Sequence, residues 1–501
     1  MKVLMVNPSI RPDSPVLFPN VGLGYITTAI NRAGIDFEIL DIDAHRFSDE
    51  EVERQIRNKQ FDALAIGTLT SHYKWVKQFT QMVKQYHPHT PIIGGNTLAT
   101  SVADTLVTRS GMDIAVLGEG EITVIELLTA LDNGGSLEEI PGLCFRNENG
   151  QVVHTEERPV IDDIDTIPFP DWDLFDIEIY LSKSKHMAPL SVQSEINYDK
   201  IVGMPVSTAR GCPFRCTFCY HAFQEKKYRH RTPENVMDEI DHYKSKYDIN
   251  FVSFWDELTF YQNKATEHFA DVMIEREANV FWIGSCRSDL LKEGDLHIAQ
   301  KLKQSGCNGL GLALESGNDE IMEVMNKKCD ASDFIIQASL MHEAGLEVYP
   351  SVIIGYPQET EETIEQTFDV CRRAKVYPSV GFLEPMPGTP MYDYSREHGY
   401  ITDEEEYLLI MGDRQDLRIN LTQMETDRME NVVQTKLKDL NRYLELGLEE
   451  DSLIKTRVYR AAKTEKGFLT DKTKKAVKES FLEGFGTAAA VASGESSKKN
   501  D

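Results

Sequence analysis

Short apolar runs alternate with longer amphipathic segments along most of this chain, and they do so in two separate series. Such runs are typical of buried strands, and segments with a 3.6-residue apolar period are typical of helices. In the first series the predicted strands are 3–6, 37–40, 63–66, 91–93 and 114–117, and the predicted helices include 21–33, 74–86 and 122–132. This alternation predicts an α/β domain of the doubly wound, Rossmann-like or flavodoxin type.

The second series predicts a different α/β architecture. Its predicted strands are 206–208, 251–254, 280–285, 309–314, 347–354 and 380–383, and its predicted helices include 234–247, 264–276, 332–344 and 360–374. Six consecutive βα units are typical of a parallel barrel, so we expect a partial (β/α)6 TIM-like barrel. Functional residues of such a barrel lie at the carboxyl ends of its strands.

The two series set the expected domain organisation. After the second series the pattern is helical, with one apolar face at Val433, Leu437, Leu440 and Leu444, and the last residues are small and polar. We predict a first domain over 1–140, a connector over 141–200, a barrel over 201–400, a helical domain over 401–486 and a disordered tail over 487–501.

The charge of the chain argues against several classes of partner. A formal net charge of −28 disfavours attraction to nucleic acid or to anionic lipid. No apolar stretch approaches the ~20 residues of a membrane span, and the first residues lack a signal-peptide pattern. We therefore expect a soluble, cytoplasmic protein with no nucleic-acid partner and no transmembrane segment. The basic segment 455–478 is expected to be a solvated helical face.

Three of the eight cysteines form one short motif, C-x-x-x-C-x-x-C. Cys212, Cys216 and Cys219 lie within eight residues, whereas the other cysteines are scattered, which is not the pattern of a disulfide scaffold. Three thiolates at this spacing can bind three irons of a cubane cluster and leave the fourth iron open to a substrate. A zinc site with His221 or His230 as its fourth ligand is the alternative.

This motif, with Phe218 before its third cysteine, resembles the signature of the radical S-adenosylmethionine superfamily. The resemblance implies a [4Fe–4S] cluster on Cys212, Cys216 and Cys219, with S-adenosyl-L-methionine bound at the open iron. An electron from the cluster would cleave the sulfonium to methionine and a 5′-deoxyadenosyl radical, and Phe218 would stand beside the adenine. A flavodoxin- or ferredoxin-type reductant is the implied partner.

Later segments resemble further superfamily elements in the same order. The residues that the resemblance assigns to S-adenosylmethionine are Asp256 and Glu257 after the second predicted strand, Glu315 and Ser316 after the fourth, Gly355 after the fifth and Pro385 after the sixth. All of them follow strands, where a parallel barrel has its active face. Arg287, after the third strand, could meet a carboxylate or form a structural ion pair.

The first domain resembles the cobalamin-binding domain that is fused to many radical S-adenosylmethionine enzymes. The resemblance covers about 1–415 and rests on Asn7-Pro8, Gly22-Leu23-Gly24-Tyr25, 67–71, 94–96, 118–121 and 165–170. It assigns cobalamin binding to Gly67, Thr68, Thr70, Ser71, Gly94, Gly95, Asn96, Gly118 and Glu119. Glycines let the backbone approach a bulky ligand closely. A flavodoxin-like domain without a ligand is the alternative.

One departure concerns the ligand of cobalt. Cobalamin domains of mutases carry D-x-H-x-x-G, but the nearest string here, Asp43-Ala44-His45-Arg46-Phe47-Ser48, lacks the glycine and follows the second strand. We therefore expect no histidine on the cobalt, which fits methyl donation and also fits a domain that has lost its cofactor. His72 and Tyr73 are expected to face solvent or to pack against the protein rather than to meet a corrin.

Three functions are weighed. The leading hypothesis is a cobalamin-dependent radical methyltransferase that acts on an unactivated carbon or phosphorus of a small-molecule or lipid-like substrate. The second is a radical cyclase, dehydratase or rearrangement enzyme without net methyl transfer, because some members of the family resemble tetrapyrrole ring cyclases. The third is a non-catalytic cobalamin or iron–sulfur carrier or sensor. No residue identifies the substrate or a catalytic acid or base.

Overall fold

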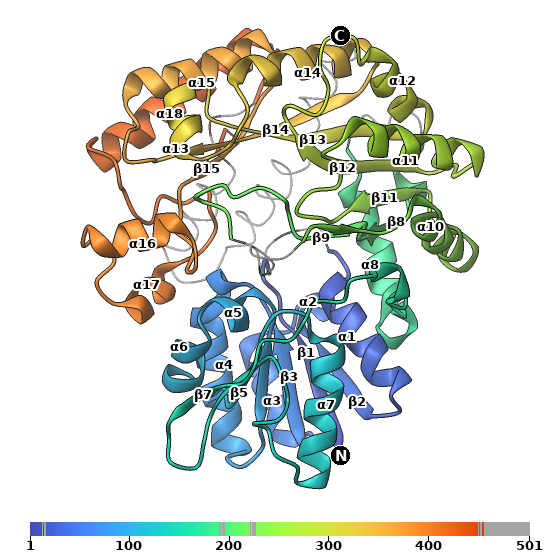
Figure 1. Ribbon diagram of the computed structural model, residues 1–501, viewed down its shortest axis with the longest axis vertical. Helices are drawn as coiled ribbons and strands as arrows, with labels where there is room; N and C mark the ends of the chain where they lie inside the picture. The colour runs from blue at the N-terminus through green and yellow to red at the C-terminus, as the bar shows by residue number, and fades with distance from the viewer. Residues whose placement is uncertain are drawn as a thin grey trace, which may run out of the picture.

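The structure is a computed structural model, which describes residues 1–454 apart from 13, 15, 16, 190, 191, 193–195, 221, 223–226, 449, 451 and 452 (Figure 1). The predicted basic face at 455–478 and the predicted disordered tail at 487–501 lie outside the described residues. The same is true of the end of the predicted helical domain.

A seven-stranded sheet forms the core of the first domain, in the order β2-β1-β3-β4-β5-β6-β7. Its strands are β1 (Lys2–Asn7), β2 (Asp36–Asp41), β3 (Ala63–Gly67), β4 (Ile92–Gly95), β5 (Ile114–Val116), β6 (Leu143–Arg146) and β7 (Val152–His154). The first five are parallel, and β6 and β7 extend the sheet in antiparallel fashion. These last two strands come from the segment that we predicted as a connector.

Helices cover both faces of this sheet because its strands are apolar on both sides. On β1, Val3 and Met5 belong to the cluster that contains Ile30 of α1, whereas Leu4 and Val6 belong to the cluster on the opposite face. The helices are α1 (Val21–Arg32), α2 (Ile42–His45), α3 (Asp49–Asn58), α4 (Tyr73–Tyr86), α5 (Asn96–Ser101), α6 (Ala103–Arg109) and α7 (Gly120–Asn133). The predicted doubly wound fold is confirmed.

The second sheet has six parallel strands in the order β15-β14-β13-β12-β11-β8. They are β8 (Gly203–Val206), β11 (Phe251–Phe254), β12 (Phe281–Arg287), β13 (Cys307–Glu315), β14 (Glu347–Ile354) and β15 (Ser379–Phe382). Within the described residues β8 and β15 do not pair, so the sheet curves as an open half-barrel. The predicted partial barrel is confirmed.

Helices pack on the outer face of the half-barrel and leave its inner face available to ligands. Val352 and Ile354 of β14 join the core under these helices, while Ser351 and Ile353 between them are half-buried. The helices are α10 (Pro233–Tyr247), α11 (Asn263–Glu275), α12 (Leu296–Gln304), α13 (Asp319–Val324), α14 (Ala331–Glu343) and α15 (Glu361–Arg373). The chain continues with α16 (Pro390–Glu397), α17 (Glu404–Ile410) and α18 (Thr426–Tyr443).

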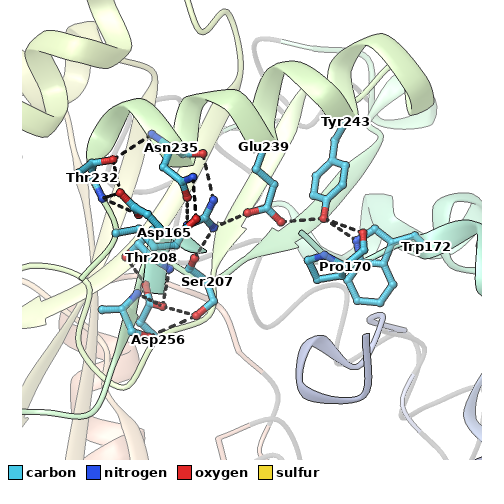
Figure 2. A network of polar contacts seen from close by, with 12 residues as sticks. Asp165, Pro170, Trp172, Ser207, Thr208, Thr232, Asn235, Glu239, Tyr243 and Asp256 are labelled. Carbon is cyan, nitrogen blue, oxygen red and sulfur yellow. Dashed lines mark hydrogen bonds and ion pairs between the residues drawn. The ribbon is translucent and has the colours of Figure 1, made fainter. Parts of the chain in front are cut away.

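The connector holds the two domains together through a buried tryptophan. Trp172 is fully buried, and its indole N–H donates to the Tyr243 hydroxyl of α10 at 3.0 Å (Figure 2). On the other side a Cβ at Gly24 of α1 would lie 2.6 Å from the Trp172 ring, so only glycine permits this contact. α8 (Ile177–Lys183) follows in the connector.

The carboxyl ends of the two sheets face each other (Figure 1). Glu119, three residues after β5, contacts Arg210 of β9 (Ala209–Arg210) and Arg229 of β10 (Arg229–His230) in the second domain. α17 lies against the first domain, where Glu405 accepts a hydrogen bond of 2.7 Å from Tyr73 of α4. Among the described helices, none combines the length and the apolar character needed to cross a membrane.

Candidate active site

The three clustered cysteines lie on the loop that connects β9 to β10. All three are half-buried. Among the described residues, the only ligand trio with all atoms within 4.8 Å of one another lies elsewhere, so at least two of these three sulfur atoms are further apart than that. Three thiolates around one zinc would lie about 3.8 Å apart. The loop as it stands is therefore not closed around a single zinc ion.

Burial makes these thiols poor acids until a metal replaces their protons. It raises the pKa of Cys219 to about 12 and also raises the pKa values of Cys212 and Cys216. The cations of Arg287 and Lys327 act in the opposite direction on Cys216. Coordination deprotonates a thiol outright, so this environment suits metal-bound thiolates.

Contacts from two segments fix the cysteine loop before any ligand binds. The Thr217 amide donates to the Met325 carbonyl at 2.9 Å, and the Asn326 side chain donates to the Arg215 carbonyl at 2.7 Å. The Met391 amide of α16 donates to the Thr217 carbonyl at 3.1 Å. The loop is thus tied both to the segment after α13 and to α16.

Arg287, at the end of β12, also anchors this loop. Its guanidinium lies 3.7 Å from the centre of the Phe214 ring, between the first and second cysteines. The same group pairs with Asp289 at 2.8 Å and donates to the Lys327 carbonyl at 2.6 Å. Of the two roles considered for Arg287, the structure shows the structural ion pair.

Asp256 and Glu257 follow β11 but occupy different environments. The Asp256 carboxylate accepts hydrogen bonds from the Thr208 amide at 2.7 Å, the Thr208 hydroxyl at 2.6 Å and the Ala209 amide at 3.0 Å (Figure 2). Asp256 therefore fixes the chain that leads into the cysteine loop.

Glu257 has no hydrogen bond or ion pair within the described part of the chain, and the residue is exposed. The surrounding protein desolvates its carboxylate and Asp256 repels it, which together raise its pKa to about 7.

A second set of contacts connects the segment that leads into the cysteine loop to α10. The Arg231 guanidinium donates to the Ser207 carbonyl at 2.8 Å and forms a buried ion pair with Glu239. Glu239 in turn accepts from Tyr243 at 2.7 Å, so the network reaches the connector (Figure 2). The entrance to the cysteine loop is therefore braced by buried polar contacts.

Glu315 and Ser316 end β13 in a sharp turn. Glu315 has φ +63°, in the left-handed region, and its buried carboxylate binds the Lys327 ammonium at 3.0 Å. Ser316 is buried, and its hydroxyl accepts from the Asn318 amide at 3.1 Å. The hydroxyl of Ser316 thus stabilises the turn.

The remaining predicted S-adenosylmethionine residues line the neighbouring strand ends. Gly355 after β14 has φ +117°, a conformation that favours glycine. Phe218 makes an edge contact with Tyr356, with ring centres 6.4 Å apart, and lies 6.0 Å from the Lys327 ammonium. Pro385 is buried after β15, and its carbonyl accepts from Tyr407 at 2.9 Å.

The glycines at the strand ends of the first domain differ in what surrounds them. A Cβ at Gly95 or Gly118 would meet no atom within 4 Å, as expected of a cradle for a bulky ligand. A Cβ at Gly94 would instead lie 3.1 Å from Met112 and 3.2 Å from Leu106, within the core. A Cβ at Gly67 would lie 3.7 Å from the Cβ of Asn96. The open positions fit a cobalamin site.

Among the hydroxyls predicted for cobalamin, two are buried and engaged inside the domain. The Thr68 hydroxyl lies 3.1 Å from Nδ1 of His72, and the Thr70 hydroxyl lies 2.9 Å from that of Ser101. Ser71 is half-buried. Burial lowers the pKa of His72 to about 4, and its ring stacks on Trp75.

His45 is also held within the protein. Its Nε2 lies 2.7 Å from the Asp176 carboxylate of the connector, and its ring stacks on Phe47. These two contacts fix the orientation of the His45 ring.

Glu119, which the resemblance assigns to cobalamin, lies between the two domains. It is buried, and its Oε1 accepts from Arg210 at 2.7 Å and from Arg229 at 2.8 Å. Its Oε2 accepts from the Ile161 amide of the connector at 2.6 Å. Because Arg210 lies two residues before Cys212, Glu119 links the first domain to the cysteine loop.

Three of these site residues were absent from the sequence prediction: Arg210, Arg229 and Lys327. The position of Arg210 next to the cysteine motif was the one local signal. Arg229 and Lys327 carry no local pattern, because their partners come from distant segments.

Comparisons with known proteins divide the chain into the same two domains as the structure does. Residues 13–128 match the model of the B12 binding domain, and residues 206–371 match that of the Radical SAM superfamily. A protein of Pyrococcus horikoshii described as an uncharacterized methyltransferase is 28% identical over 403 residues, which are 79% of this chain and 83% of that protein.

A second relative is described as a cyclase rather than as a methyltransferase. The anaerobic magnesium-protoporphyrin IX monomethyl ester cyclase of Rubrivivax gelatinosus is 26% identical over 381 residues, which are 74% of this chain and 66% of that protein. Among solved structures, the cobalamin-dependent S-adenosylmethionine radical enzyme OxsB with aqua-cobalamin bound has a TM-score of 0.69 at 14% identity, covering 97% of this chain and 80% of that one. This likeness supports the two-domain fold.

Proposed function

We propose that this chain, a radical S-adenosylmethionine enzyme with a cobalamin-binding domain, transfers a methyl group to an unactivated carbon or phosphorus of a small-molecule substrate. The matches to both domains confirm the predicted cofactors, a [4Fe–4S] cluster, S-adenosyl-L-methionine and cobalamin. The observation that carries methyl transfer is that the carboxyl ends of both sheets face each other, with Glu119 of one domain bound to Arg210 beside the cluster motif of the other. Both cofactor sites then open on one shared space.

For the cluster site we assign Cys212, Cys216 and Cys219 as the ligands. Glu257 is the better partner for the amino group of S-adenosylmethionine, because the carboxylate of Asp256 already accepts from Thr208 and Ala209. Phe218 and Gly355 line the adenine side in this assignment. The role of Glu315 is to orient Lys327 near the cysteines.

The residues of the chain position and shield the reactants. When bound, the cluster supplies an electron that cleaves S-adenosylmethionine, and cobalamin carries the methyl group. The contacts of Thr217, Asn326 and Arg287 preset the cysteine loop, so little reorganisation accompanies binding. The first domain covers the open face of the half-barrel, which protects a reactive radical from water.

We further propose a flavodoxin- or ferredoxin-type protein as the reductant and the cytosol as the location. Cluster-driven cleavage requires a low-potential electron donor. The eight thiols of the chain, none of them in a disulfide in the described structure, suit a reducing compartment.

Radical cyclisation without methyl transfer is the second candidate. The similarity to the Rubrivivax gelatinosus cyclase favours it, because that relative matches across both domains. The two functions differ in their products: methyl transfer yields S-adenosylhomocysteine together with deoxyadenosine, whereas a cyclase need not consume the methyl group.

The test follows a deuterated methyl group. The reconstituted enzyme receives methyl-deuterated S-adenosylmethionine, a reductant, hydroxocobalamin and a small-molecule extract of the source organism. We expect a product that is heavier by the labelled methyl group, together with S-adenosylhomocysteine and deoxyadenosine.

Two variants control this test. Cys216→Ala should abolish all three products, while Cys371→Ala, which alters a buried cysteine of α15, should retain them. Deoxyadenosine without transfer of label would reject methyl transfer in favour of the cyclase class.

A further inference from the structure

A second group of ligating side chains lies at the edge of the first domain, outside the active site. Asp104 of α6, Cys144 of β6 and His154 of β7 place one oxygen, one sulfur and one nitrogen within 4.8 Å of one another. Cys144 and His154 are register partners in the antiparallel pair, so they project from the same face of the sheet. α6 packs against β6 and β7 and supplies the third group (Figure 1).

The separations suit a single tetrahedral ion. Cys144 Sγ lies 3.6 Å from His154 Nε2 and 3.8 Å from Asp104 Oδ1. Typical zinc–ligand bond lengths predict ligand separations of roughly 3.4–3.6 Å. The carboxylate and imidazole are now 2.5 Å apart and would open by about 1 Å, which their exposed side chains permit.

The same geometry argues against a catalytic triad. In a triad the histidine contacts the nucleophile with one ring nitrogen and the carboxylate with the other. Here Nε2 of His154 faces both Cys144 and Asp104. Three ligand atoms that converge on one point are the arrangement of a metal site.

We propose that Asp104, Cys144 and His154 bind one Zn²⁺, with water from the exposed side as the fourth ligand. The Cys144 thiol, whose pKa burial and Asp104 raise to about 12, releases its proton to solvent as the Zn–S bond forms. Thiolate and carboxylate together balance the charge of the ion. The metal would tie the short edge strand β7 to α6.

The metal would also act close to the domain interface. Thr105, the residue after Asp104 in α6, donates a hydrogen bond to Glu404 of α17 in the C-terminal region. A rigid α6 would therefore support the seat of α17 on the first domain.

The test measures zinc on the full chain with its iron–sulfur cluster already reconstituted, so that the cluster cysteines are occupied by iron. The sample is dialysed against Zn²⁺, and zinc and iron are counted together. We expect one zinc per chain, and X-ray absorption at the zinc edge should show one sulfur near about 2.3 Å with nitrogen and oxygen as the other neighbours.

Variants identify the ligands. His154→Gln and Asp104→Asn alter exposed side chains and should lower bound zinc to background, with iron content unchanged. Cys144→Ser should remove the sulfur signal. His297→Gln, an exposed histidine on α12, should retain one zinc. Zinc retained by both His154→Gln and Asp104→Asn, or bound without a sulfur neighbour, or absent from the unaltered chain, would overturn the proposal.

Discussion

At the scale of single residues, Glu359 illustrates how burial changes an ionisable group in this barrel. Its carboxylate accepts from the Gly355 amide at 3.3 Å and from the Thr363 hydroxyl at 2.5 Å, but burial dominates and raises its pKa to about 7. In the unfolded chain a glutamate has a pKa of about 4.3. The stability that this difference provides is fully present below the unfolded pKa and is lost as the pH rises toward 7.

We therefore predict that Glu359→Gln gains stability relative to the unaltered chain as the pH rises. Glutamine mimics the neutral acid, so the relative gain between pH 5 and pH 8 should be on the order of 2 kcal/mol. Urea unfolding followed by circular dichroism at both pH values measures it. Glu362→Gln, an exposed position at the start of α15 three residues further on, should show little change. An equal effect of Glu359→Gln at the two pH values would contradict the prediction.

At the scale of elements, two adjacent glycines at the end of β4 have different surroundings. Gly94 faces Met112 and Leu106 in the core, whereas Gly95 faces open space. We predict that Gly95→Val retains the thermal stability of the chain but loses binding of hydroxocobalamin, because its side chain would fill the cradle. Equilibrium dialysis against hydroxocobalamin measures the loss.

Gly94→Val is the matched comparison. Its side chain would overpack the core and should cost about 1–3 kcal/mol of stability. The two variants together separate overpacking of the core at Gly94 from filling of the open space at Gly95. Normal cobalamin binding by Gly95→Val would show that the open space is not the cobalamin site.

At the scale of the whole molecule, Glu119 connects the two domains. It accepts from Arg210 and Arg229, which flank the cysteine loop. Glu119 and Arg229 are buried, and Arg210 is half-buried. We predict that Glu119→Gln destabilises the protein by about 3–5 kcal/mol, because it removes the buried carboxylate that Arg210 and Arg229 share and leaves Glu121 as the acidic partner of Arg210. Calorimetry should show the two domains unfolding at more widely separated temperatures.

Glu126→Gln provides the control, because Glu126 is an exposed residue of α7, the helix that begins after Glu119. Its pair with Arg158 has one exposed partner, so its loss should cost no more than about 1 kcal/mol. If Glu119→Gln left both the stability and the calorimetric profile unchanged, the buried cluster would not hold the domains together.

The local patterns of the sequence were sufficient to predict the main strands and helices and the type of chemistry. Strand and helix periodicity depends on neighbouring residues, so it predicted both parallel sheets, and the spacing of Cys212, Cys216 and Cys219 predicted one loop with three thiols. Because parallel strands end at one edge, the order of the motifs also predicted which segments would share the site.

Tertiary structure decided which polar groups are available to a ligand. Glu119 and Asp256 both follow strands, as cofactor-binding residues do, yet their partners Arg210 and Thr208 lie 91 and 48 residues away. Hydrogen bonding across such distances depends on how the domains pack, which no local pattern records. The same reason explains why β6 and β7 extend the first sheet, and why Asp104, Cys144 and His154 meet only in the folded chain.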